Sequence, residues 1–321
     1  MLSSPSFQRA NRSGNLVIQR AGYALMILDF RRPLILLAVV GFSFAPCAFA
    51  ETSDSSLLEA GFRGMYELHF DQARQIFAQY QQEHPEDSLG KAAEAASYLF
   101  EELNNKDVLS SEFFLNDKKL LVGIDGKPDR SLCDPFLEAN HSARRMAQEK
   151  LKENPRDPHA LFVAAIADGM ESDYEAILAK RPLASLGFVK RAEEEANRLI
   201  ATNSQADDAY DAYVAVGTGN YIIGSLPSYK RAFLWFDGIH GDKQRGMQQV
   251  AQTAEHGHYL QPFAKILLAL ASEREHQVVR ARDLLADLAK EFPENPLFAR
   301  ELAIAEKLQP KTCCEVQPVQ P

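Results

Sequence analysis

Cysteine is scarce in this sequence, and the few that occur show no regular spacing. Four are present in 321 residues: Cys47, Cys133, Cys313 and Cys314. They do not predict a disulfide framework, which needs paired cysteines at regular intervals. The vicinal pair lies in a polar, proline-bearing tail without a nearby histidine, which favours exposed thiols over a redox or metal site.

The sequence also lacks the motifs by which enzymes and nucleotide sites are usually recognised. It contains no G-x-S-x-G, no Walker A, no H-E-x-x-H and no G-x-G-x-x-G after a strand. His256 and His258 stand two apart with no acidic partner at a zinc-enzyme spacing, so we expect turn histidines. The run Glu193–Glu195 fits the solvated face of a helix. The prediction is no enzyme, no cofactor and no metal.

Basic residues are in the minority: 35 lysines and arginines stand against 44 acidic residues, a net charge of −9. Residues 1–50 hold five arginines and one aspartate, so the remainder carries a net charge of −13. An acidic protein repels both phosphate backbones and anionic lipid. Nucleic acid and membrane surfaces are therefore not expected as partners.

Residues 1–50 resemble an export signal. Arg31 and Arg32 precede an apolar run that ends near residue 44, and Ala48 and Ala50 supply small side chains at the −3 and −1 positions. This order predicts cleavage after Ala50 and a periplasmic or secreted protein. The apolar run is shorter than the about 20 residues of a transmembrane span.

Other interpretations of the leader stay open. Cys47 could anchor a lipoprotein, but Pro46 stands where that signal requires glycine or alanine. An uncleaved amphiphilic anchor is the second alternative. The polar stretch before Met26 suggests either a long n-region or a start codon assigned too early.

A twelve-residue interval recurs three times. An Ala-Arg pair precedes a proline, counted from the alanine, in Ala73-Arg74…Pro85, Ala143-Arg144…Pro155 and Ala281-Arg282…Pro293. Three residues after each alanine comes a large apolar residue: Ile76, Met146 and Leu284. Residues three and four apart share a helical face, so each stretch predicts an amphipathic helix with the alanine as a point of close packing.

Each proline is followed two residues later by an N-cap residue. These residues are Asp87, Asp157 and Asn295, and in two copies a further proline follows, Pro158 and Pro296. Asp or Asn at the N-cap with Pro at the first helical position is a strong helix-start signal. The unit is a helix, a turn and a capped helix, which is typical of a helical solenoid.

The first copy resembles the tetratricopeptide repeat (TPR) family. Gly61, Phe70, Ala73, Phe77 and Pro85 fall at that family's spacings. The sequence departs from the pattern in two places, Tyr80 for a small residue and Leu57 for the first-helix tryptophan. Over much of 55–308 the chain is similar to exported bacterial TPR proteins without assigned activity. The resemblance implies an all-α, right-handed solenoid whose concave face binds peptides or protein segments.

The units can be placed along residues 51–308, with a flexible tail at 309–321. After the second pair, further pairs are expected at 157–180 with 185–202, 206–225 with 242–256, and 261–273 with 277–292, and a capping helix at 295–308. This gives about five helix pairs. A short β-hairpin at 118–129, turning at Asp125-Gly126, is expected to interrupt the second pair. Two glycines in 216–221 (VGTGNY) and Gly246 predict close helix packing.

The richest surface candidate is 208–241, which carries four tyrosines and the only tryptophan. The partner-binding prediction comprises Tyr210, Tyr213, Asn220, Tyr221 and Trp235. Aromatic side chains concentrate at binding hot spots, although the rings could equally fill the core between units. Residues 226–241 could add a packing helix or a patch for a partner or membrane. The resulting hypothesis is an exported interaction scaffold that binds a protein or peptide segment within a cell-envelope complex; the alternative is a small-molecule or glycan binder.

Overall fold

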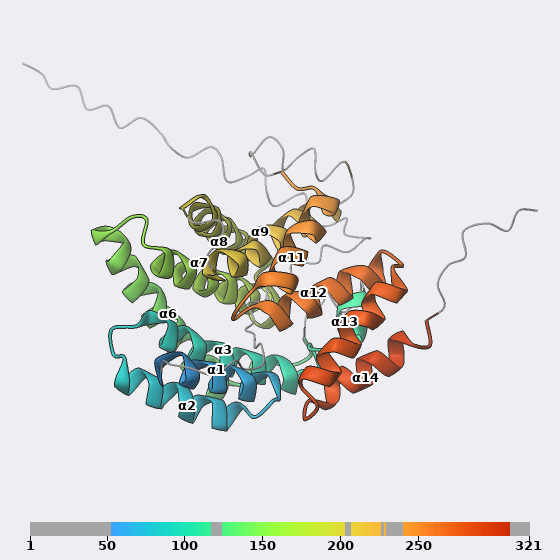
Figure 1. Ribbon diagram of the computed structural model, residues 1–321, viewed down its shortest axis with the longest axis horizontal. Coiled ribbons are helices and arrows are strands. Elements are labelled where there is room, and N and C mark those ends of the chain that lie inside the picture. The colour runs from blue at the N-terminus through green and yellow to red at the C-terminus, as the bar shows by residue number, and fades with distance from the viewer. Residues whose placement is uncertain (1–52, 117–123, 203–206, 226–227, 229–239, 309–321) are drawn as a thin grey trace, which may run out of the picture. The chain divides into compact units, whose positions relative to one another are not determined.

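Helices packed in adjacent pairs make up this protein, as a computed structural model shows (Figure 1). The structure describes residues 53–116, 124–202, 207–225, 228 and 240–308. Within these ranges no strand occurs. The helices are α1 (Ser53–Tyr66), α2 (Phe70–Glu83), α3 (Ser88–Asn105), α4 (Ser111–Leu115), α6 (Arg130–Glu153), α7 (Pro158–Asp173), α8 (Pro182–Thr202), α9 (Asp207–Ser225), α11 (Lys243–His256), α12 (Gln261–Arg274), α13 (Val278–Glu291) and α14 (Pro296–Ala305), with a π-helical turn, η1 (Tyr174–Leu178), after α7.

The pairing follows the prediction. Helix α1 packs on α2, α3 on α6, α7 on α8, α9 on α11 and α12 on α13, while α14 packs on α13. Each pair also contacts the next, through α2 and α3, α6 and α7, α8 and α9, and α11 and α12. In the part of the chain that the structure describes, the all-α fold of five helix pairs and a final helix is therefore confirmed. Each hairpin hides its apolar side against its neighbours, as expected for a repeat array.

The repeated turn has the same geometry in all three copies. The main-chain N–H of the capping residue donates to a carbonyl three residues earlier, at 3.1, 3.0 and 3.1 Å for Asp87, Asp157 and Asn295. The side-chain Oδ1 of each then accepts from a main-chain N–H in the first helical turn, at 2.8, 2.8 and 2.9 Å. The predicted N-caps of α3, α7 and α14 are confirmed.

The alanines of the Ala-Arg pairs are close-packing points. Ala73, Ala143 and Ala281 have no exposed surface. The apolar stripe differs in detail from the prediction, because the residues at +3 are half-buried while those at +4 are buried: Phe77, Ala147 and Leu285. At 3.6 residues per turn, the +4 side chain lies nearer the direction of the alanine than the +3 side chain does.

The arginines of these pairs link each unit to the helix that follows. The guanidinium of Arg74 donates to Glu101 of α3 at 2.7 Å. Arg144 lies 3.4 Å from Asp168 of α7. The Nε of Arg282 donates to the carbonyl of Ala305 at the end of α14, at 2.9 Å. The arginine therefore recurs because one position on the second helix always faces the next helix. Its role was not anticipated from the sequence.

Glycines set the approach of α9 to α11. A Cβ on Gly246 would lie 2.4 Å from the main-chain nitrogen of Tyr221 and 2.6 Å from the carbonyl oxygen of Gly217. A Cβ on Gly217 would lie 2.7 Å from the nitrogen of Val250. Only hydrogen fits at these positions, so the close packing predicted for VGTGNY and Gly246 is confirmed.

The hairpin expected at 118–129 is not formed in its described half. Residues 124–126 make a bend and residues 127–129 have no regular structure, with Gly126 at φ 77° and Ile124 buried. The reason is local: Pro128 removes a main-chain donor, and Asp129 caps α6 by accepting from Ser131 N at 2.8 Å. Residues 117–123 lie outside the described part. The insertion between α3 and α6 instead contributes the short helix α4.

Several sequence predictions fall outside the described ranges. These are the leader with its cleavage site and Cys47, most of 226–241 with Trp235, and the tail with Cys313 and Cys314. They stay predictions. Cys133 is free and buried in α6, where burial raises its pKa to about 12. Of the helices in the ranges given above, none combines the length and apolar character needed to cross a bilayer.

Candidate functional site: a cavity beside α4

The first and last parts of the helical array contact each other. The Nδ2 of Asn295, in the turn before α14, donates to the main-chain oxygen of Tyr66 at the end of α1, at 2.7 Å. The Tyr66 ring packs on Phe292 with centroids 5.3 Å apart. Arg63 donates to the carbonyl of Glu291 at 3.1 Å. The turn after α1 and the turn before α14 therefore form one joint wall.

Aromatic contacts fix α12 and the turn before it against α1, α3 and α7. Tyr259, just before α12, packs on Phe62 of α1 at 5.3 Å and on Phe162 of α7 at 6.4 Å between centroids. Phe263 of α12 meets Phe100 of α3 edge-on, at 6.2 Å. These rings bury large apolar areas, and they hold α12 beside α1 and α3.

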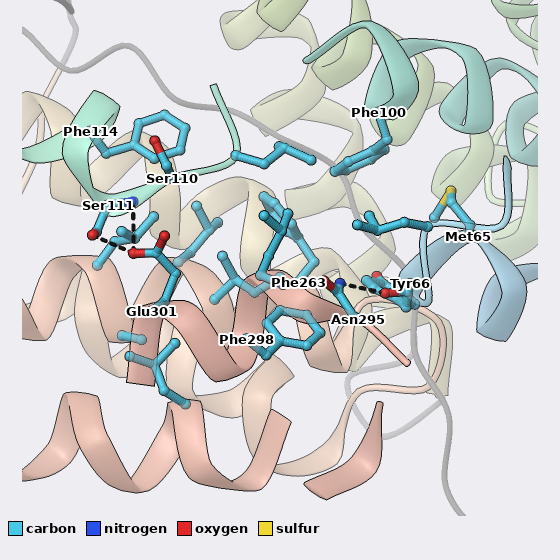
Figure 2. Close-up of a pocket in the computed structure, with 18 of the residues that line it drawn as sticks. Met65, Tyr66, Phe100, Ser110, Ser111, Phe114, Phe263, Asn295, Phe298 and Glu301 are labelled. Atoms are coloured by element: carbon cyan, nitrogen blue, oxygen red, sulfur yellow. Dashed lines mark hydrogen bonds between the residues drawn. The ribbon is translucent and has the colours of Figure 1, made fainter. Parts of the chain in front are cut away.

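A cavity of about 80 Å³ lies in this region. Its walls come from the turn between α1 and α2, from α3, α4, α12 and α13, and from the start of α14 (Figure 2). Most of the lining is aromatic or aliphatic: Met65, Phe100, Phe114, Phe263 and Phe298 are labelled in the close-up. An apolar pocket with a few convergent polar groups is the usual form of a ligand site.

Two carboxyl groups line this apolar cavity. Glu301 of α14 accepts hydrogen bonds at Oε2 from the main-chain N–H of Ser111, at 3.2 Å, and from its hydroxyl. Its Oε1 accepts from Arg300 at 3.1 Å. Glu273 of α12 is 7% exposed, and its Oε2 has no hydrogen-bond partner among the described residues. Burial, and secondarily the charge of Glu301, raise the pKa of Glu273 to about 7.

Helix α4 is held in place like a bound peptide. Phe113 and Phe114 are buried, at 6% and 5% exposure. The guanidinium of Arg274, at the end of α12, donates to the carbonyl of Phe114 at 3.1 Å. Together with the Ser111–Glu301 contact, side chains of α12 and α14 thus hold main-chain groups at both ends of this five-residue helix. A second cavity of about 40 Å³ lies beyond Phe114, lined by α9, α11 and α12.

The structure places Tyr210 and Tyr213 on one part of α9, with ring centroids 6.5 Å apart. Both rings are partly exposed. Tyr210 also packs on His256 at the end of α11, at 5.1 Å. Residues three apart share a face of a helix, so these two rings lie side by side on α9. Their role in binding a partner stays a prediction.

Two further predicted site residues, Asn220 and Tyr221, take part in helix contacts. The Nδ2 of Asn220 donates to Gln249 of α11 at 2.9 Å. Tyr221 is 9% exposed, and its hydroxyl donates to Glu275 at 3.2 Å. Trp235 lies outside the described ranges. A binding role for the five predicted residues is not tested and stays a prediction.

Sequence reasoning missed Glu273, Glu301 and α4. One signal was available, because Glu273 interrupts an otherwise apolar face of α12: Ile266, Leu270 and Glu273 recur at helical spacing, and all three line the cavity. The joint wall formed with Tyr66 could not be found this way. It depends on residues 229 positions apart in the chain.

Three side chains at the joint between α1 and α14 could hold a metal ion. Glu67, His69 and Glu294 bring ligand atoms within 4.8 Å of one another. The Nε2 of His69 lies 3.5 Å from Glu294, and Glu67 pairs with Arg63 at 3.1 Å. His69 and Glu294 are exposed. Exposed acidic groups in such an arrangement are common without a bound ion.

The comparisons with known proteins give information on the fold alone. No family model matches the chain, and no curated protein matches it. Among solved structures it is similar to a thermophilic TPR protein of Thermus thermophilus, with a TM-score of 0.43 and 12% sequence identity, over 80% of this chain and 100% of that one. A likeness this distant says nothing about function, which is therefore inferred from the site.

Proposed function

We propose that the protein is an exported scaffold that binds an extended segment of a partner protein within the cell envelope. The leader sequence motivates the location. The repeat pattern motivates the binding role, because stacked helical hairpins present broad surfaces for protein segments. The absence of a recognisable catalytic motif in the sequence agrees with binding rather than chemistry.

One observation carries the proposal: the array already holds a peptide, its own α4. Arg274 and Glu301 bind main-chain groups, which do not depend on the bound sequence, and the neighbouring cavities take apolar side chains such as Phe114. Main-chain hydrogen bonds combined with side-chain pockets are the usual means of recognising an extended segment. A partner segment would use the same groups by taking the place of α4.

Weakening the hold of α4 tests this proposal. Phe114→Ala removes an anchor of α4 and leaves the scaffold groups Arg274 and Glu301 intact. Leu115→Ala changes the same helix at a residue that is 36% exposed, and it serves as the matched control. The partner is first captured from an envelope fraction with the purified full chain and identified by mass spectrometry. Its affinity for each variant is then measured by calorimetry.

We expect Phe114→Ala to raise the affinity for the partner several-fold and Leu115→Ala to leave it unchanged. The physical reason is competition, because a partner no longer has to displace a well-anchored internal segment. Reduced affinity in Phe114→Ala would mean that α4 belongs to the binding surface instead. A photo-cross-linker at Tyr213, with one at exposed Gln82 of α2 as control, tests whether α9 also contacts the partner.

The cavity favours a second function, the binding of a small molecule. The specific observation is the buried carboxyl of Glu273, which has an oxygen without a hydrogen-bond partner in the described ranges. Buried polar groups are nearly always hydrogen-bonded in native proteins. An unpartnered one that lines a cavity therefore points to a group that enters from outside.

A further inference from the structure

We infer that the cavity between α4, α12 and α14 binds a short aliphatic primary amine, with its ammonium group on Glu273 and its carbon chain among the apolar walls. This inference rests on the small-molecule function proposed above and does not require the binding of a protein segment. Because α4 lines the cavity, a protein segment that replaces α4 would compete with the amine.

The size of the cavity limits the carbon chain. A cavity of about 150 Å³ lined by apolar side chains accommodates benzene. The cavity here is about 80 Å³, so it fits an apolar group of roughly three to five carbon atoms by that comparison. The walls that would contact this group include Phe100, Phe263 and Phe298.

The charge of the site selects a cation. Two carboxyl groups, Glu273 and Glu301, line the cavity, and a carboxylate ligand would be repelled by both. Glu301 is already engaged by Ser111 and Arg300. Glu273 is not, so its Oε2 is the acceptor that remains for an incoming donor. An ammonium group on a carboxylate makes charge-assisted hydrogen bonds, which are about twice as strong as neutral ones.

Apolar burial and charge pairing have to act together at this site. Removing an isolated ammonium from water is costly unless a counter-charge and hydrogen bonds offset the loss. Glu273 supplies the counter-charge, while the rings of the cavity favour transfer of the methylene groups at about 0.8 kcal/mol each, or about fourfold in affinity per methylene. Neither a bare cation nor an alcohol uses both contributions.

A ligand series measured by calorimetry on the purified full chain at pH 8 tests the inference. The probes are n-butylamine, ethylamine, n-butanol, butyrate and ammonium chloride. We expect saturable binding of n-butylamine, binding of ethylamine weaker by about tenfold or more because two methylene groups are missing, and no binding of butyrate or ammonium. n-Butanol should bind at least about tenfold more weakly than n-butylamine, because it lacks the charge.

Glu273→Gln removes the charge and keeps the shape of the side chain. It should weaken n-butylamine by about tenfold or more and leave n-butanol unchanged. The matched control is Glu255→Gln in α11, an exposed glutamate outside the cavity, which should change neither affinity. Circular dichroism checks that both variants fold, and should Glu273→Gln fail to fold, the ligand series on the unaltered chain decides.

Three results would overturn the inference. The first is equal affinity for n-butylamine and n-butanol, which would indicate an apolar cavity without charge selection. The second is saturable binding of ammonium alone, which would indicate a simple cation site. The third is no detectable binding of n-butylamine, or binding that Glu273→Gln leaves unchanged.

Discussion

The amide Nδ2 of Asn295 donates a hydrogen bond to the main-chain oxygen of Tyr66, 229 residues earlier in the chain, while the Oδ1 of the same side chain caps α14. One asparagine thus caps the start of α14 and ties it to the end of α1. Asn295 is 4% exposed, so water does not readily replace either hydrogen bond. The cavity wall that includes Tyr66 and Asn295 depends on this link.

Substitution of Asn295 should separate these two roles. Asn295→Ala loses the cap and the link, and we expect the free energy of unfolding to fall by about 2–3 kcal/mol. Asn295→Ser retains a capping oxygen but cannot reach Tyr66, so a loss of about 1 kcal/mol is expected. Urea unfolding of both variants measures the difference. Equal losses would mean that the cap contributes nothing, whereas an Asn295→Ser variant as stable as the unaltered chain would mean that the contact with Tyr66 contributes nothing.

Glu273 should make the free energy of unfolding fall as the pH rises, which is unusual for a carboxyl group. Its pKa is raised from 4.5 to about 7, so the folded state keeps a proton that the unfolded state releases near pH 4.5. The resulting stabilisation is complete below that pH and is lost as pH rises to about 7. Glu273→Gln should therefore gain stability relative to the unaltered chain between pH 5 and 8, by about 2–4 kcal/mol.

Chemical denaturation at pH 5 and pH 8 measures this gain. Glu255→Gln, which removes an exposed carboxylate instead, should show no comparable change between the two pH values. The groups near Glu273 that also carry charge are Glu301 with its partner Arg300, and Arg274. A pH-independent difference between Glu273→Gln and the unaltered chain would show that Glu273 is ionised throughout.

Asp87 should have the opposite effect at acidic pH. Burial opposes its ionisation, but hydrogen bonds from His159 at 2.7 Å, from Tyr80 and from Leu89 N outweigh burial and lower its pKa from 3.8 to about 2. A lowered pKa contributes stability that is present above pH 4 and is lost as pH falls towards 2. We expect Asp87→Asn to cost about 2 kcal/mol at pH 7 and much less at pH 2.5. Unfolding followed by circular dichroism at both pH values would show a constant cost if the ionised form has no special role.

The contact between α9 and α11 should not tolerate a side chain at Gly246. A Cβ there would meet main-chain atoms of Tyr221 and Gly217, which cannot move independently of their helix. Gly246→Ala should lower the free energy of unfolding by about 2 kcal/mol or more. Gly187→Ala in α8 is the control, because the nearest atom there is the end of Arg191 at 3.8 Å. That variant should be stabilised by about 0.5–1 kcal/mol in thermal unfolding, from helix propensity.

Local chemistry explains what could be predicted from the sequence. The N-caps Asp87, Asp157 and Asn295 act within two or three residues of their own position, and the alanines and glycines report how closely a neighbouring helix approaches. Each of these signals depends only on residues within one helix and the adjoining turn. They predicted where the helices begin, how they pair and which small residues pack closely.

The candidate site could not be predicted in the same way. The environment of Glu273 comes from α3, α4, α12, α13 and α14 together, and no local pattern records which of these lie beside one another. The five residues predicted from the richness of aromatic side chains instead include two, Asn220 and Tyr221, that connect helices.

The all-helical, paired architecture could be predicted from the sequence, because capping, periodicity and small-residue spacing act over a few residues at a time. The contacts of α4 with α12 and α14, and of Asn295 with Tyr66, are found only in the folded chain. Burial and the pKa of a group such as Glu273 depend on all the neighbours that folding brings together, and no single stretch of sequence specifies those neighbours.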